Sequence, residues 1–196
     1  MYEERKQKAR ERFKDFNATI VLRNDQFFIV DWRNRNGSGD YAVRYLLDIE
    51  KGNFIVTGDL GDSVACWFNR VTPEKLRSYI NDIGYYMSKF QTTSDQYTHD
   101  WRDVAADLEK LRKETISDNP NLYEDEVNED FHQMQELLED MDLDKGCCYT
   151  DELRELFEKY NEDWYESDFV NLGCRTSQRV ILWAVGFQMA CEQLGI

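Results

Sequence analysis

The hydrophobic pattern of this chain changes from strand-like to helical spacing after Phe68, and this change limits the fold more than any single motif does. From residue 18 to that point, short apolar runs rich in aromatic and branched residues alternate with turn signals such as Asn24-Asp25 and Asn36-Gly37. Such runs are typical of strands, and short connections between successive strands favour antiparallel pairing. Beyond Phe68 the apolar residues recur at helical spacing. The pattern predicts an α+β fold, with an antiparallel sheet of four to five strands packed with about six helices.

The strand-like and helical spacings of apolar residues also predict where the individual strands and helices lie. Strands are expected at residues 18–22, 26–32, 41–48, 54–57 and 63–68, after a helix at residues 2–17. Further helices are expected at residues 72–87, 101–111 and 122–140, after Thr150, and after Thr176 or Ser177. The nearly continuous apolar segment 180–191 predicts a central helix buried against the sheet.

A polar stretch at residues 91–96 suggests where the chain divides. Residues 1–90 would hold the N-terminal helix, the sheet and the first packing helix. Residues 91–196 would form an acidic helical region, which we expect to pack on the sheet as one unit.

Charge is distributed unevenly along the chain. The net charge is −15, yet residues 1–90 hold 15 basic and 13 acidic side chains, and residues 91–196 hold 9 basic and 26 acidic ones. Residues 118–168 alone carry 19 acidic side chains against three basic ones. Such a surface repels phosphate backbones and attracts basic grooves. We therefore expect a basic protein partner, and no direct DNA binding by the acidic half.

The composition of the chain argues against a membrane protein, a secreted protein and a zinc-binding protein. No apolar run approaches the roughly 20 residues of a membrane span, and charge begins at Glu3, which is unlike a secretory signal. The five cysteines are odd in number and lack the spacing of zinc ligands, which fits a reducing compartment. We expect no membrane association, no cofactor and a location in the cytoplasm.

The acidic helices supply the candidate binding face. Side chains three and four positions apart share a helix face, so carboxylates at this spacing form ridges, and we expect little internal neutralisation there. The predicted partner-binding residues are Glu124, Asp125, Glu126, Glu129, Asp130, Glu136, Glu139, Asp140, Asp142 and Asp144. Such an array could occupy a protein groove that is built to hold nucleic-acid phosphates.

A weaker pattern in the same region is similar to a calcium-binding loop. Asp140, Asp142 and Asp144 alternate and Glu152 follows, as calcium loops require of their oxygen ligands. Lys145 occupies the position where such a loop has glycine. We expect an acidic connection without metal, and a calcium-responsive binding module stays open as an alternative.

Residues 57–62 form the most specific local feature of the strand region. Gly58 and Gly61 between apolar runs imply positive φ angles or close backbone approach, and Asp59 lies between them as a turn residue. Asp59 and Asp62 are the residues on which a metal-dependent nuclease, the enzymatic alternative, would depend.

No recognisable catalytic motif accompanies this turn. His99 and His132 form no metal-binding pair, and phosphate-binding glycine loops and hydrolase elbows are absent from the sequence. We predict no catalytic residues and no enzyme.

Several segments resemble a motif in small proteins of phages and mobile elements. An aromatic-rich strand at residues 45–49 leads to a turn, residues 54–61 end in Gly-Asp-x-Gly, and Phe68-Asn69-Arg70 gives an aromatic-x-Arg ending. Residues 179–184 resemble the Trp-containing final helix of the same group. The similarity covers about a third of the chain, and residues 50–53 depart from the usual Trp-Pro-Gly turn.

The resemblance implies a setting but no chemistry, since the matched motif defines no catalytic residue. Together with the small size and the acidic helices, it is similar to anti-CRISPR inhibitors, which bind an effector nuclease such as Cas9 and block its guide-RNA or target-DNA channel. Our leading interpretation is a phage-encoded inhibitor of this kind, acting in the cytoplasm of an infected bacterial host through a nucleic-acid-mimicking face.

Overall fold

The structure is a computed structural model, which describes residues 2–139, 141, 149–166 and 168–196. It divides into two compact units. The first, here called the sheet unit, comprises Met1–Gln96 and Thr176–Ile196, and the second, the helical unit, comprises Tyr97–Arg175. The division therefore differs in extent from the boundary expected near residue 90, because the chain returns to the sheet unit at Thr176.

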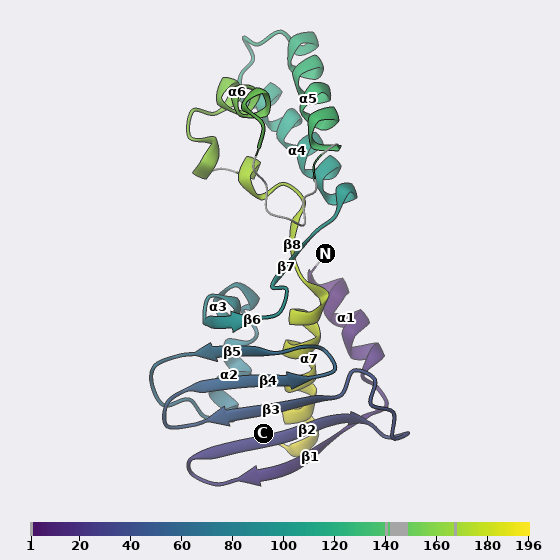
Figure 1. Cartoon of the computed structure of the whole chain (residues 1–196), viewed down its shortest axis with the longest axis vertical. Helices are drawn as coiled ribbons and strands as arrows, with labels where there is room; N and C mark the ends of the chain where they lie inside the picture. The colour runs from purple at the N-terminus through teal and green to yellow at the C-terminus, as the bar shows by residue number, and fades with distance from the viewer. Residues whose placement is uncertain (1, 140, 142–148, 167) are drawn as a thin grey trace. The chain divides into compact units, whose positions relative to one another are not determined.

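The sheet unit is built on a six-stranded antiparallel meander with the order β1-β2-β3-β4-β5-β6 (Figure 1). Its strands are β1 (Phe16–Arg23), β2 (Phe27–Asn34), β3 (Val43–Asp48), β4 (Asn53–Gly58), β5 (Ser63–Cys66) and β6 (Phe90–Thr93). Each strand pairs with the next one in sequence, as short connections favour. The α+β class and the antiparallel sheet are confirmed, and the sheet has one strand more than expected.

The additional strand, β6, lies partly in the polar stretch that was expected to be a linker. Its pairing with β5 places Ser63 opposite Thr93 and Val64 opposite Thr92. Phe90 anchors the strand, because its ring contacts those of Tyr86 and Trp183. The segment therefore forms a strand despite its polar composition, because its backbone pairs with β5 and the Phe90 ring packs against the core.

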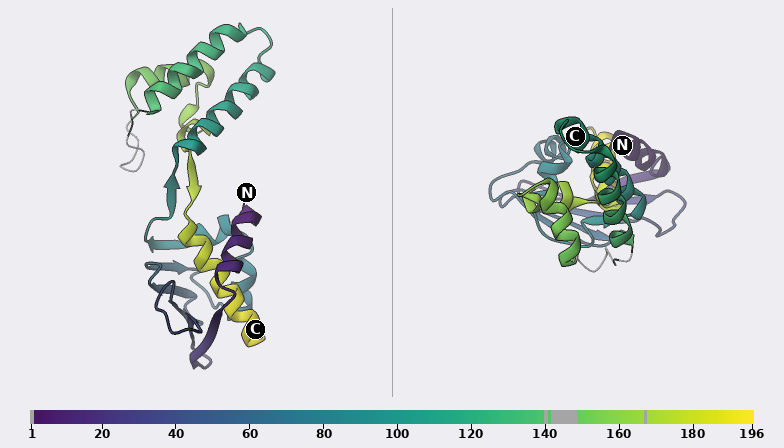
Figure 2. Two further views of the ribbon diagram at one scale, coloured as in Figure 1. Left: turned by 90° about the vertical axis from the view of Figure 1, so that its right-hand side faces the viewer. Right: turned by 90° about the horizontal axis from the view of Figure 1, so that it is seen from above.

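Four helices belong to the sheet unit: α1 (Tyr2–Arg12), α2 (Pro73–Tyr79), α3 (Ile83–Met87) and α7 (Gln178–Leu194). Helices α1 and α7 lie on the same side of the sheet (Figure 2). The helix expected at residues 72–87 is two helices, because the side chain of Asp82 caps a new start by accepting the N–H of Tyr85. Helix α1 ends before residue 17, because Phe16 already pairs with Asn34 in the sheet.

Helix α7 is the core of the sheet unit, as its apolar sequence predicted. Eleven of its residues are buried, and Trp183 and Phe187 are fully buried. The Phe187 ring contacts the rings of Tyr45 and Phe54 on the covered face of the sheet. Burial of an aromatic side chain of this size contributes about 2–3 kcal/mol, so this contact is one of the substantial stabilising contacts of the unit.

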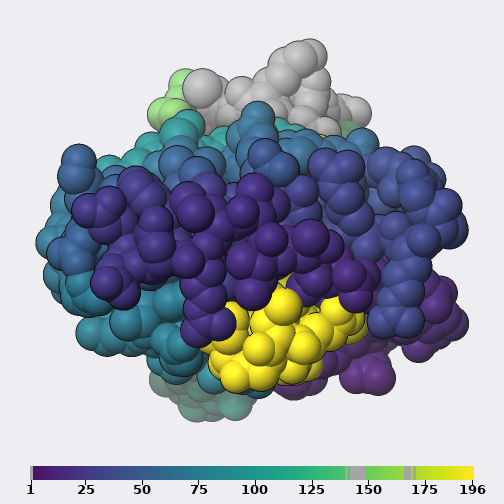
Figure 3. All heavy atoms as spheres, turned by 90° about the horizontal axis from the view of Figure 1, so that it is seen from below, coloured from purple at the N-terminus to yellow at the C-terminus, as the bar shows by residue number. Residues whose placement is uncertain are grey.

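The end of α7 also covers part of the free edge of the sheet. Gln193 accepts the N–H of Ala18 at 3.1 Å and donates to the carbonyl of Phe16 at 2.9 Å, as a neighbouring strand would. The C-terminal residues reach the surface beside the N-terminal part of the chain (Figure 3). A side-chain amide therefore occupies the edge groups of β1 that could otherwise pair with another chain.

The helical unit contains α4 (Trp101–Asp118), α5 (Glu124–Glu139) and α6 (Asp151–Tyr160). Two short strands, β7 (Tyr97–His99) and β8 (Cys174–Thr176), pair where the chain leaves and returns. Each helix buries one apolar stripe in a second core, whose buried aromatic members include Phe131, Tyr149, Phe157 and Phe169. In the part of the chain that the structure describes, no helix is long and apolar enough to cross a membrane.

Gly186 tests how tightly α7 packs on the sheet. Replacing a helical glycine by alanine normally stabilises a helix by about 1 kcal/mol, but a Cβ at Gly186 would lie 2.4 Å from the hydroxyl of Tyr45. That hydroxyl donates to the carbonyl of Trp183 inside the core. We expect Gly186→Ala to lower the free energy of unfolding, measured by urea denaturation, by about 1–3 kcal/mol.

The matched control is Gly84→Ala in α3, where an added Cβ has an ordinary contact, 3.5 Å from Asp82. This variant should be neutral or more stable. Equal stabilisation by both substitutions would contradict the tight contact between α7 and the sheet.

Candidate functional site

The two units of the molecule differ strongly in net charge. The helical unit contains 24 acidic and 8 basic side chains, and the sheet unit contains 15 acidic and 16 basic ones. The helical unit therefore carries a net charge of −16 and the sheet unit one of +1, so the negative charge of the molecule arises from one compact unit of the fold. This separation points to the surface of the helical unit as the candidate binding site.

Helix α5 displays carboxylates on the face opposite its core stripe. The buried residues are Val127, Phe131, Met134 and Leu138. At 100° per residue, Asp125, Glu129 and Glu136 point away from this stripe, and all three are exposed. We call Asp125, Glu129, Glu136 and the neighbouring exposed Glu139 the outward carboxylates of α5.

Two of the predicted binding residues are instead engaged inside the unit. Lys159 on α6 approaches Asp130 at 2.5 Å and Glu126 at 2.7 Å, and the hydroxyl of Tyr160 donates to Asp130. Asp130 is only 15% exposed. The hydrogen bond to Asp130, followed by that to Glu126, raises the pKa of Lys159. The expectation of little internal neutralisation is therefore wrong for Glu126 and Asp130, which join α5 to α6.

The outward carboxylates have few interactions of their own. Glu139 accepts a hydrogen bond from Gln135 on the same helix, and Glu136 lies 3.7 Å from the imidazole of His132. Among the described residues, none makes a hydrogen bond or ion pair with the side chain of Asp125 or Glu129. The fold therefore uses Glu126 and Asp130 and leaves these carboxylates available.

The other predicted residues of this surface fall into two groups. Glu124 is exposed in the first turn of α5, where negative charge also favours the helix dipole. Asp140, Asp142 and Asp144 lie outside the described residues.

Asp140, Asp142 and Asp144 are also three of the four candidate calcium ligands, so the structure does not describe most of that predicted site. The fourth, Glu152, accepts a hydrogen bond from Gln133 at 2.6 Å and so contributes to the contact between α5 and α6. Among the described residues, no group of three histidine, cysteine or carboxylate side chains could hold a metal ion. His132 is exposed on α5, and His99 lies in β7.

The glycine turn has the geometry expected of it and uses its aspartate internally. Gly58 has a φ of 140° and Gly61 a φ of 84°, and a Cβ at Gly58 would lie 2.3 Å from the carbonyl of Ala42. The carboxylate of Asp59 accepts the N–H of Tyr41 at 2.7 Å. Asp59 therefore has a structural role, but it holds the connection between β2 and β3 and not its own turn.

The aromatic-x-Arg segment packs against the turn between β3 and β4. The backbone N–H of Trp67 donates to the carbonyl of Gly52, and Arg70 forms an ion pair with Glu50. A Cβ at Gly52 would lie 2.2 Å from the carbonyl of Asn69, so only glycine fits there. The aromatic-x-Arg segment, which contributes to the resemblance, thus lies beside the turn at residues 50–53, where the chain departs from it. Sequence spacing alone could not show this contact.

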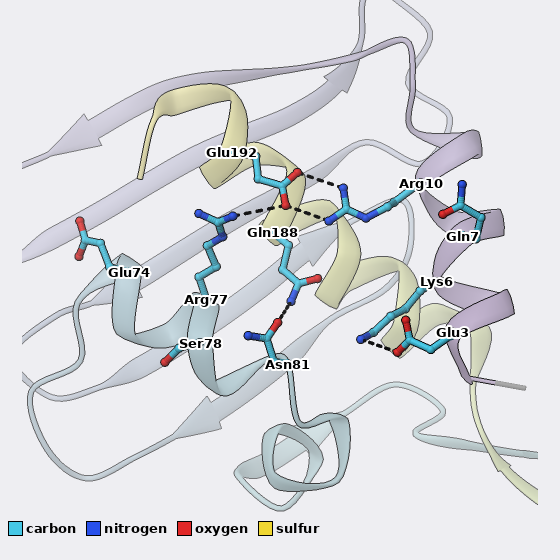
Figure 4. A pocket seen from close by; sticks show the side chains of 10 residues that line it. All are labelled: Glu3, Lys6, Gln7, Arg10, Glu74, Arg77, Ser78, Asn81, Gln188 and Glu192. Atoms are coloured by element: carbon cyan, nitrogen blue, oxygen red, sulfur yellow. Dashed lines mark hydrogen bonds and ion pairs between the residues drawn. The ribbon is translucent and has the colours of Figure 1, made fainter.

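A polar cleft of about 470 Å³ in the sheet unit was not predicted (Figure 4). Helices α1, α2 and α7 line it, and its centre is Glu192, which binds Arg10 through both oxygens and also Arg77. The hydrogen bond from Arg10 lowers the pKa of Glu192. In the floor, Gln188 donates to Asn81 at 2.9 Å. These contacts join segments far apart in sequence, so no local pattern signals them.

A second unpredicted cluster fixes the return of the chain at β8. Arg175 binds both oxygens of Asp107 on α4, at 2.8 and 2.7 Å, and the N–H of Gly173 donates to the same carboxylate at 2.9 Å. Burial raises the pKa of Asp107, but the hydrogen bonds from Arg175 and Gly173 outweigh this and lower it. This clamp joins α4 to the returning chain through a bidentate ion pair and a backbone hydrogen bond.

Comparison with known proteins supplies the origin of the chain. A family model described as a phage family matches residues 33–188. The chain belongs to this phage family. The match spans both units, and it confirms the expected phage origin while the anti-CRISPR assignment stays a prediction. No curated protein and no solved structure matches the chain.

The clamp between Asp107 and Arg175 predicts an acid-dependent stability of this phage protein. Because folding lowers the pKa of Asp107, its ionised form stabilises the fold above the ordinary pKa of about 4, and this contribution is lost as pH falls through the folded value. Asp107→Asn should lower the free energy of unfolding at neutral pH by about 2 kcal/mol. Thermal unfolding as a function of pH should show that the difference from the wild type shrinks in acid.

Asp118→Asn is the matched control, since Asp118 is exposed at the end of the same helix. It should cause no loss of stability at either pH. A pH-independent difference between Asp107→Asn and the wild type would contradict the role of the charged clamp.

Proposed function

We propose that this phage protein is an inhibitor that binds a basic nucleic-acid channel of a host effector nuclease, of the CRISPR type such as Cas9. The observation that carries the proposal is the separation of charge: 24 acidic against 8 basic side chains in the helical unit, beside a nearly neutral sheet unit. Solubility needs a net charge of only about 2–8 on a small domain. The membership of a phage family supports the biological setting.

The spacing of the outward carboxylates suits a groove that holds phosphates. From Asp125 to Glu139 the helix rises about 21 Å, at 1.5 Å per residue. Four charges over this length give one per about 7 Å, roughly half the linear density of one DNA strand. A groove lined with Lys and Arg would therefore attract this face, whereas nucleic acid itself would be repelled.

The mechanism is occlusion, without a catalytic step. Long-range attraction between the acidic unit and a basic channel speeds association. Once bound, the helical unit fills the space that guide RNA or target DNA would occupy. Binding of this kind weakens as salt increases, because exposed charges are screened beyond about 10 Å at moderate ionic strength.

Charge reversal of the outward carboxylates tests the proposal. In the variant Glu129→Lys, Glu136→Lys and Glu139→Lys, each new side chain is a good helix former and none replaces a residue of the contact between α5 and α6. We expect its affinity for purified, guide-free Cas9 to fall about 100-fold, with a weaker salt dependence. Biolayer interferometry at a series of salt concentrations measures both quantities.

The matched control reverses three exposed carboxylates of the sheet unit, Asp25, Asp40 and Asp62, and so changes the net charge equally. It should bind and inhibit Cas9 as the wild type does. If both variants lost the same affinity for Cas9, the net charge of the protein, and not the outward carboxylates of α5, would explain the binding. The absence of wild-type binding to Cas9 would reject this partner, and binding that is unaffected by guide RNA would reject the channel as its site.

A further inference from the structure

Two large apolar side chains are exposed at the start of α5. The connection between α4 and α5 forms the tip of a helical hairpin, and every residue from 117 to 126 is exposed. Two of them are large and apolar: the side chain of Tyr123 is 80% exposed and that of Leu122 is 44% exposed. They directly precede Glu124, Asp125 and Glu126, so aromatic surface and negative charge meet within one helical turn.

Tyr123 also occupies a position that local helix chemistry disfavours. Its carbonyl accepts the N–H of Val127 at 3.1 Å, which makes it the N-cap residue of α5. Helices α2, α3, α4, α6 and α7 each begin after a Ser, Thr or Asp whose side chain accepts a backbone N–H. A tyrosine ring offers no acceptor to the first amides, and the acidic first turn compensates only through the helix dipole.

These two observations are independent and point the same way. An exposed aromatic ring gains nothing from burial in this chain, and the same residue gives up a capping bond that five other helices make. Residues that break a local rule without compensation in the fold are expected at functional positions. Tyrosine is moreover among the residue types that dominate binding energy at protein interfaces.

We infer that Tyr123, assisted by Leu122, is the anchor residue of the interface and inserts into an apolar pocket at the rim of a basic protein groove. Charge complementarity selects this occupant, because the carboxylates of the next turn would be desolvated beside the pocket and require Lys or Arg around it. A second copy of this chain would instead bring two acidic hairpin tips together. The inference rests on the proposed function, and it adds a contact that determines the lifetime of the complex.

Site-specific photocrosslinking tests the anchor without assuming the partner. p-Benzoylphenylalanine replaces Tyr123, Glu129 on the outward face, or Tyr165, a tyrosine of the same unit that is 59% exposed and serves as the matched control. Each variant is irradiated in the phage's bacterial host and the adducts are mapped by mass spectrometry. The inference is supported if position 123 crosslinks to an apolar residue in the nucleic-acid groove of a basic protein and position 165 does not.

The other outcomes separate the two proposals. Adducts at position 129 without any at position 123 would overturn the anchor and leave the proposed function intact. Adducts at position 123 to proteins without a basic groove would overturn both, as would the absence of adducts at all three positions.

A capping substitution then measures what the anchor contributes. Tyr123→Ser restores a cap, so the melting temperature of the helical unit should rise by about 5 °C, which also shows that the variant is folded. Its complex with the crosslinked partner should dissociate at least about tenfold faster, with an unchanged salt dependence, because no charge is altered. Wild-type dissociation kinetics in a stabilised Tyr123→Ser variant would overturn the anchor role.

Discussion

The contact between α7 and the sheet is the constraint on which the rest of the fold depends. The chain builds the whole meander first, leaves the sheet unit after Gln96, and must return to supply the helix that covers the sheet. At the crossing, the N–H of Ser177 donates to the carbonyl of Gln96 at 2.9 Å, and Arg179 pairs with Asp95 at 2.8 Å. The helical unit is therefore an insertion between two parts of one core. Its surface can carry a large charge because the apolar contacts of the sheet unit do not depend on it.

The ion pairs of the helical unit separate carboxylates that build the fold from those that do not. Asp107 holds the return of the chain through Arg175, and Asp130 holds α5 against α6 through Lys159. Both are at most about one quarter exposed, and each uses one of the few basic residues of the unit. The acidic excess that remains is consequently concentrated on exposed positions such as Glu129 and Glu136. The contacts that stabilise the fold do not require these exposed carboxylates.

Periodicity allowed most of the fold to be predicted, and long-range geometry accounts for what it missed. The strands, the cap of α2 at Thr72 and the buried character of α7 follow from local pattern, because each depends on neighbours in sequence. Strand β6 could not be recognised, since its polar residues pair only because Phe90 is drawn into a core formed by Tyr86 and Trp183.

The candidate surface was predictable only in part, for the same reason. Helical spacing correctly placed Asp125, Glu129 and Glu136 on an exposed face. It could not show that Lys159, 29 positions later in the chain, would neutralise Asp130. The importance of Tyr123 was also hidden, because an aromatic residue before an acidic helix looks like a core residue until its exposure is known.

The cost of the acidic face depends on what surrounds it. In water, two unit charges about 7 Å apart interact by only about 0.6 kcal/mol, and salt weakens this further, so the exposed carboxylates along α5 repel one another only weakly. In a groove with low-dielectric walls the same charges interact several times more strongly. The face is therefore tolerated in the free protein, and its electrostatic energy is realised when a groove of opposite sign encloses it. Attraction of this kind is non-directional, so an aromatic anchor at one end of the helix would fix the register that charge alone leaves open.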